Sequence, residues 1–195
     1  MNYYQLEPNP GSKKWKGYEN PDFYLWNDCE ELTLSYLYKL NKKWSFEFLE
    51  YRTIKEGRMP PVHSIGAKFV IFNADIQKIK SIELPCLQLV PIMNKSSLRK
   101  YYLLNVYKQV DCVDWEKSEI VRWPDGEKIE EWQNKRGRVF INPVLIKDKI
   151  PIDLDAFKLQ EWGGAFNIII SERLKEIICG LDFDKSFLSF KMQET

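Results

Sequence analysis

The sequence has 195 residues, of which 44% are hydrophobic and 14% are aromatic. A chain of this length buries roughly 70% of the surface that its unfolded form exposes, so it can form its own core and need not be disordered. Its 29 basic and 28 acidic residues leave a net charge of +1. This balance argues against a dedicated nucleic-acid-binding protein, because phosphate contacts require a basic excess on one face.

The chain shows no sign of export or of a membrane span. Met1–Leu6 contains no basic segment followed by an apolar stretch, which a signal peptide requires. Apolar runs such as Ile168–Ile170 are far shorter than the roughly 20 residues that cross a bilayer. We therefore expect a cytoplasmic protein with no membrane contact. Its four cysteines are far apart and are expected to be reduced, mostly buried thiols: Cys29, Cys86, Cys112 and Cys179.

Four strands are predicted in the N-terminal third. Tyr3–Glu7 is a short strand closed by a turn and Phe23–Leu25 is a second, and apolar residues on alternating positions predict Glu31–Tyr38 and Trp44–Phe48. Leu37 and Leu40 keep a helix open as an alternative for the third of these. Gly57–Gly66 contains two consecutive prolines and is interpreted as a connecting loop. We expect one domain, residues 1–195, and leave open a division at this loop into lobes 1–60 and 61–195.

A strand, a polar capping residue, a short amphipathic helix and a second strand occur twice along the chain. The first copy comprises Phe69–Phe72, Asn73, a helix with Ile76 and Ile79, and Leu87–Val90. The second comprises Phe166–Ile170, Ser171, a helix with Leu174, Ile177 and Ile178, and Leu181–Phe183. Asn and Ser at these junctions can accept a hydrogen bond from the first helical turn. We interpret this pattern as a weak internal repeat.

The region between the two copies is predicted to be mostly β structure. Its predicted strands are Tyr101–Val106, Val110–Val113, Ile120–Trp123, Val139–Ile146 with an edge or bulge at Pro143, and Asp155–Leu159. Pro124-Asp125-Gly126 is a strong reversal signal, and Glu127–Gln133 is interpreted as a short polar helix or loop. The expected fold class is α+β, with mostly antiparallel or mixed sheet and a few short helices.

Few residues suggest chemistry. His63 has no second histidine and no nearby cysteine, so we expect no metal and no cofactor. An acidic stretch surrounds Trp115: Asp111, Asp114, Glu116 and Glu119. Asp111 or Asp114 with His63 would make the acid–base pair of a small hydrolase. In the alternative that we favour, the stretch is a solvated turn in which Asp114 binds Ser118 and the backbone, and no residue is catalytic.

Tryptophans interleaved with acidic residues predict a partner-binding rim around aromatic anchors. The candidate residues are Asp114, Trp115, Trp123, Asp125, Glu127, Glu130, Glu131 and Trp132. The alternative is a solvated hairpin whose tryptophans pack back on the sheet. A carbohydrate- or peptide-binding module is a further interpretation, in which Trp15, Trp123 and Trp132 would offer exposed stacking surfaces.

Two parts of the chain resemble immunity-protein family eleven of bacterial polymorphic toxin systems. They are Tyr101–Val106 with Val110–Ser118, and Phe166–Leu181 with the strand around Phe183. The resemblance covers mainly residues 101–190, and Asn73-Ala74-Asp75 departs from the Ser-Glu pair expected at the first cap. It implies a cytoplasmic protein, monomer or homodimer, that binds and neutralises a cognate secreted toxin domain by occlusion, without catalysis. If that toxin is a basic nuclease, the acidic clusters would steer their association.

Overall fold

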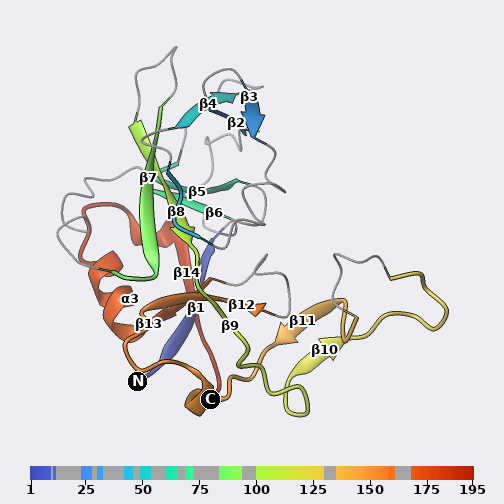
Figure 1. Ribbon diagram of the computed structural model, residues 1–195. Coiled ribbons are helices and arrows are strands. Elements are labelled where there is room, and N and C mark those ends of the chain that lie inside the picture. Colours follow the sequence, from blue (N-terminus) through green and yellow to red (C-terminus); the bar gives the residue numbers. More distant parts are fainter. Residues whose placement is uncertain are drawn as a thin grey trace.

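The computed structural model describes residues 1–9, 11, 23–27, 30–32, 42–45, 49–53, 60–65, 69–72, 84–93, 100–129, 135–160 and 168–195. Strands in these ranges form sheets of seven, five and two strands. Figure 1 shows the seven-stranded sheet above the five-stranded sheet, with the two-stranded sheet extending to one side. The expected α+β class, with mostly antiparallel and mixed sheet, is therefore confirmed.

The five-stranded sheet joins both ends of the chain. Its order is β14-β1-β13-β12-β9. The strands are β1 (Tyr3–Pro8), β9 (Gln109–Val110), β12 (Ala156–Leu159), β13 (Ile168–Ser171) and β14 (Leu188–Met192). The first strand, β1, pairs antiparallel with both β13 and β14, which brings the two termini close together (Figure 1). The predicted strands at Tyr3–Glu7 and Asp155–Leu159 are thus confirmed.

One α-helix in the described part of the chain, α3 (Glu172–Cys179), covers a face of this sheet. Leu174 and Ile178, one turn apart, are its buried residues. The Lys175 ammonium lies 3.7 Å from the centroid of the Tyr4 ring, so the stem of this lysine covers the edge of the β1 face. Besides α3, the described residues include the 3₁₀ turns η2 (Lys147–Lys149) and η4 (Lys185–Phe187).

Ser171 starts α3 as the sequence predicts. Its hydroxyl oxygen accepts the backbone N–H of Leu174 at 3.2 Å and donates to Asp155 Oδ1 at 2.7 Å. Asp155 is also paired with the guanidinium of Arg173 in the first turn. Burial raises the pKa of Asp155, but the hydrogen bonds from Arg173 and Ser171 lower it by more, so the carboxyl titrates below its ordinary range. The cap therefore ties the helix to the end of β12.

The seven-stranded sheet has the order β3-β2-β4-β7-β8-β6-β5. Its strands are β2 (Phe23–Asn27), β3 (Glu30–Leu32), β4 (Leu49–Thr53), β5 (Val62–Ile65), β6 (Phe69–Phe72), β7 (Leu87–Met93) and β8 (Lys100–Val106). The longest pairing is the antiparallel one between β7 and β8. The Gln88 side chain on β7 binds segment 42–45, accepting the Trp44 N–H at 2.8 Å and donating to the Trp44 carbonyl at 2.9 Å.

Both large sheets contribute to one hydrophobic core. It includes Val62, Leu104 and Val106 of the seven-stranded sheet together with Phe157 and Ile169 of the five-stranded sheet. The continuation of β8 into β9 leads the chain directly from one sheet to the other. Farther out, Tyr51 and Tyr101 stack edge to face with their centroids 5.5 Å apart. The proposed division into lobes 1–60 and 61–195 stays a prediction.

Several predicted elements differ from the structure. The loop predicted over Gly57–Gly66 is wrong in its second half, because Val62–Ile65 pairs antiparallel with Phe69–Phe72. The strand predicted at Leu181–Phe183 is also wrong. Leu181 N–H returns to the Ile178 carbonyl at 3.2 Å, and the Lys185 ammonium binds the carbonyls of Leu181 and Phe183, which keeps this stretch a turn. The last strand, β14, begins only at Leu188.

Other predictions are met in part or lie outside the described residues. Of the strand expected at Val110–Val113 only Val110 is in a strand, while Val113 makes an isolated bridge to Leu145. The strand expected from Val139 stops at Asn142, before Pro143. Trp44 is buried but lies outside the strands. The predictions for residues 33–40, 46–48 and 73–80 lie outside the described residues, including the first helix of the proposed repeat.

Candidate functional site

The predicted partner-binding residues that the structure describes lie on a projecting segment, residues 114–129 and 135–144, which we name the arm. Its ribbon consists of β10 (Glu119–Val121) and β11 (Val139–Asn142), paired antiparallel with a bulge between Glu119 and Ile120. Figure 1 shows the arm extending away from both larger sheets. One face of the ribbon packs inward through Phe140, which is 7% exposed, whereas Val121 and Ile141 are exposed.

The base of the arm is closed by a backbone hydrogen bond between its two ends and is joined to the C-terminal segment by two further hydrogen bonds. Asp114 N–H donates to the Val144 carbonyl at 2.9 Å, and Leu145 N–H donates to the Glu194 carbonyl at 2.8 Å. The ammonium of Lys191 on β14 donates to the Ile141 carbonyl at 3.1 Å. Because these bonds hold the base from two sides, the arm has a defined direction relative to the sheet.

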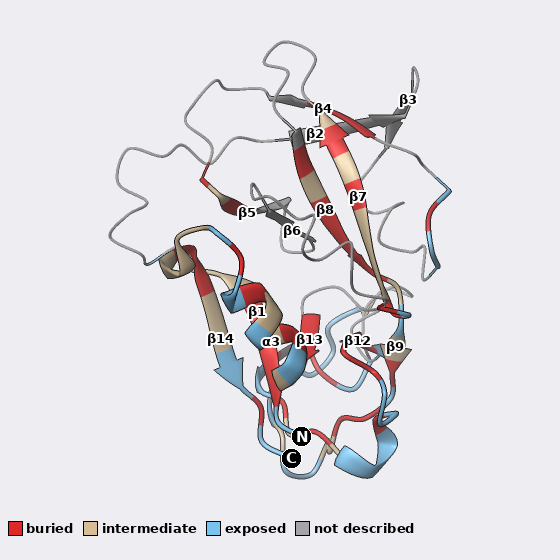
Figure 2. Cartoon of the chain, turned by 90° about the vertical axis from the view of Figure 1, so that its left-hand side faces the viewer, coloured by how far each residue is buried: buried red, intermediate tan, exposed pale blue. Residues whose placement is uncertain are grey.

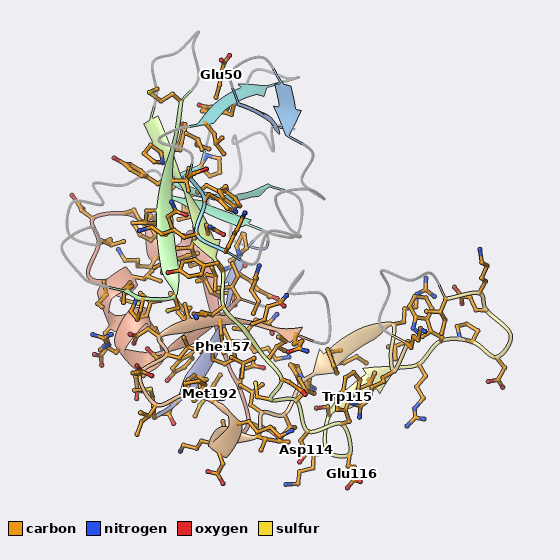
Figure 3. The ribbon with its side chains drawn as sticks, viewed as in Figure 1. Glu50, Asp114, Trp115, Glu116, Phe157 and Met192 are labelled. Atoms are coloured by element: carbon orange, nitrogen blue, oxygen red, sulfur yellow. The ribbon has the colours of Figure 1, made fainter. Side chains whose placement is uncertain are left out.

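Asp114 stabilises the turn at which the arm begins. Its carboxylate accepts the backbone N–H of Glu116 at 3.1 Å and of Lys117 at 3.2 Å. The hydrogen bond from the Lys117 N–H is the largest influence on the pKa of Asp114, which is lowered; weak burial opposes this, and the Lys117 ammonium at 3.4 Å adds to it. The interpretation of this stretch as a turn organised by Asp114 is therefore confirmed, and Figure 3 shows Asp114 and Glu116 at its outer end.

Trp115 packs against the base of the ribbon. Its ring lies 5.0 Å from the Phe140 ring between centroids, and the Arg136 guanidinium carbon lies 4.0 Å from its centroid. Position 137 accommodates only glycine without a shift of Ile120, because a Cβ there would overlap Ile120 Cγ2. The half-buried Trp115 is thus a packing residue of the arm that contacts both an aromatic ring and a cation.

Three more of the predicted residues lie on the outer part of the arm. Asp125 and Glu127 are exposed on either side of Gly126, whose φ of +81° is the left-handed conformation that the predicted reversal needs. Trp123 is half-buried, with the Arg138 guanidinium 5.7 Å from its ring centroid. Glu130, Glu131 and Trp132 lie outside the described residues.

Two features of the arm were missed by the sequence reasoning. Val121 and Ile141 expose 41% and 48% of their surface, so the ribbon presents apolar side chains to a partner. Segment 119–142 also has five acidic and five basic residues, so the arm is a mixed-charge surface and its acidic clusters do not stand alone. Counting the basic residues of Arg122–Arg138 together with the acidic ones would have revealed this.

The residues of the hydrolase interpretation come from different sheets. His63 is on β5 of the seven-stranded sheet, whereas Asp111 and Asp114 follow β9 of the five-stranded sheet. In the part of the chain that the structure describes, no three His, Cys, Asp or Glu side chains form a group that could hold a metal ion.

The described cysteines are free thiols: Cys86 and Cys112 are buried and Cys179 is exposed. Burial raises the pKa of the Cys86 thiol, which keeps it protonated and unreactive. None of the described helices is both long and apolar enough to cross a membrane.

The described residues therefore form an α+β core from which a two-stranded ribbon projects. A model of the Immunity protein family (Imm11) matches residues 89–191, from β7 through β14, which is more than half of the chain. The chain belongs to this family, and the resemblance found in residues 101–190 is confirmed. No curated protein matches the chain.

Proposed function

We propose that this protein is a cytoplasmic immunity protein of a bacterial polymorphic toxin system, and that it neutralises a cognate toxin domain by binding and covering it. Membership of the immunity family carries the proposal. The arm supports it, because it lies within the matched residues and presents Val121, Ile141 and a half-buried Trp123 together with charged side chains. Aromatic and apolar anchors within a charged rim are typical of protein–protein interfaces.

Occlusion and catalysis differ in stoichiometry, which provides the test. The toxin domain encoded beside this gene is titrated with purified protein, and its remaining activity is measured. If the protein acts by occlusion, the remaining toxin activity falls linearly and reaches zero at an equimolar ratio, and a complex is recovered in which both partners are unmodified. Co-expression should also restore the growth of cells that produce the toxin.

The hydrolase alternative gives the opposite result. An enzyme would protect at a small fraction of the toxin concentration, and Asp111→Asn or His63→Ala would abolish protection. Under the proposed mechanism these two variants bind and protect like the parent protein. Absence of a complex and of growth rescue would contradict the proposal.

A further inference from the structure

Strand β14 borders the five-stranded sheet, and no described strand pairs with its outer edge. In an antiparallel ladder, the backbone groups of alternate residues point to opposite edges of the strand. Gln193 N–H donates to the Tyr3 carbonyl at 2.9 Å, and the Phe187 carbonyl accepts Asn9 N–H at 2.7 Å. Odd-numbered residues of this strand therefore face β1, and the backbone groups of Leu188, Phe190 and Met192 face outward. Figure 2 shows β14 at the border of the sheet, exposed toward its C-terminal end.

The outward groups of this edge have almost no partners within the described residues. Leu188 N–H turns back to the Lys185 carbonyl of η4, and no pairing is found for the outward backbone groups of Phe190 and Met192. The Met192 side chain is 59% exposed. Beyond it, the outer edge is used again, since the Glu194 carbonyl accepts Leu145 N–H. Within the described residues, the unpaired part of this edge thus runs from the Leu188 carbonyl to Met192, in a five-residue window between η4 and the base of the arm.

We infer that this window pairs with the same window of a second copy of the chain. In an antiparallel pairing centred on Phe190, Phe190 lies opposite Phe190 and Leu188 lies opposite Met192. The two Phe190 residues can then exchange both of their backbone hydrogen bonds, and each Met192 N–H can donate to the Leu188 carbonyl of the other copy, while the Leu188 N–H stays bonded to Lys185. The two five-stranded sheets would continue into one sheet across a two-fold axis, which is the symmetry that most homodimers use.

The pairing centred on Phe190 places chemically compatible side chains opposite each other. The two neighbouring registers, centred on Lys191 and on Ser189, do not do so over the whole window. Leu188, Phe190 and Met192 share the α3 face, since Phe190 registers with Leu6 and Met192 with Tyr4. Apolar side chains therefore oppose apolar ones, and Lys191 on the other face opposes Ser189. A pairing centred on Lys191 would instead set two ammonium groups opposite each other, and one centred on Ser189 would leave Met192 unpaired.

The short window implies a weak dimer whose population depends on protein concentration. A ladder of this length buries less surface than a permanent interface does. The pairing would use backbone groups of β14 that the arm does not bind, although the Lys191 side chain on this strand donates to the Ile141 carbonyl of the arm.

Sedimentation analysis of the full chain over a wide range of concentration tests this inference. Met192→Pro removes an outward N–H while leaving the inward bonds of Lys191 and Gln193 to β1 in place. We expect the dimer dissociation constant to rise by about tenfold or more. Met192→Leu, the matched control, keeps both the N–H and an apolar side chain, and should dimerise like the parent protein.

Amide hydrogen exchange supplies a second readout that does not depend on a variant. The amides of Phe190 and Met192 should become protected as the concentration rises, while those of Ser189 and Lys191, bonded to β1, stay protected throughout. A parent protein that is monomeric at every concentration overturns the inference. A monomer whose Met192→Pro variant loses toxin binding overturns it too, and would assign the edge to a strand of the toxin.

Discussion

At the level of single residues, Ser171 joins the start of α3 to the Asp155 carboxylate. It is fully buried, caps α3 through the Leu174 N–H and donates to the Asp155 carboxylate. Replacing it with alanine leaves one helical N–H without its cap and removes one hydrogen bond from a buried charge. We expect Ser171→Ala to lower the free energy of unfolding by about 2 kcal/mol, measured by urea denaturation. Ser189→Ala on β14 is the control and should cost little; equal losses in both variants would contradict the capping role.

Lys158 gives the protein a predictable alkaline response. Its side chain is 3% exposed on β12, and burial lowers its pKa from 10.5 to about 8. Below pH 8 both the folded and the unfolded chain carry the proton, and the folded state bears the cost of burying the charge. Between pH 8 and 10.5 the folded state releases its proton first, so the unfolded state binds more protons and stability rises with pH.

Lys158→Met removes this charge and keeps the length of the side chain. We expect its free energy of unfolding to increase at neutral pH by up to about 3 kcal/mol. The rise in stability between neutral and alkaline pH should be correspondingly smaller than in the parent protein. Denaturation curves at a series of pH values measure both effects. Lys108→Met changes an exposed lysine nearby and should leave the pH profile unchanged.

At the level of elements, the sequence predicted correctly those helices and strands whose formation depends on residues close together in the chain. The helix start at Ser171 depends on a capping residue followed by apolar positions four apart, and both are visible in the sequence. Strand β5 was missed because its partner β6, rather than its own composition, makes it a strand. Phe183 was misplaced for a similar reason, since the Lys185 ammonium holds the carbonyls of this stretch in a turn.

The ribbon of the arm depends on a tight contact at Gly137. This glycine is buried beneath Ile120 and close to Trp115. Gly137→Ala forces Ile120 away from the Trp115–Phe140 packing, and we expect a local cost of about 1–3 kcal/mol. Hydrogen exchange of the β10 and β11 amides should accelerate, and toxin affinity should fall. The amides of the β7–β8 pairing serve as the internal control and should not change. Uniform acceleration would show that the arm is not an independent unit.

At the scale of the whole molecule, the sequence predicted which segment forms the candidate site. It did not predict how that segment packs or how it is attached to the rest of the protein. The sequence marked Trp115, Trp123 and Asp125 through their aromatic and acidic character. It could not show that Trp115 packs within the arm, because the Phe140 and Arg136 that enclose it lie more than twenty residues away. The anchoring of the arm by Lys191 depends on a pairing between the two ends of the chain, which no local pattern contains.

The mixed charge of the arm leads to a kinetic prediction. If the arm meets the toxin first, its charged outer residues steer the encounter, and their effect on the association rate weakens as salt screens them. Asp125→Lys with Glu127→Lys changes two exposed residues beside Gly126. We expect the association rate with the toxin to fall by about tenfold or more at low salt for a basic partner, and the difference to shrink at high salt. Surface plasmon resonance at several salt concentrations measures this association rate.

Asp153→Lys, an exposed charge reversal outside the arm, is the control and should change the rate far less. Equal rates for all three proteins at low salt would place the first contact elsewhere on the molecule, whereas faster association of the arm variant would identify an acidic toxin surface facing Asp125.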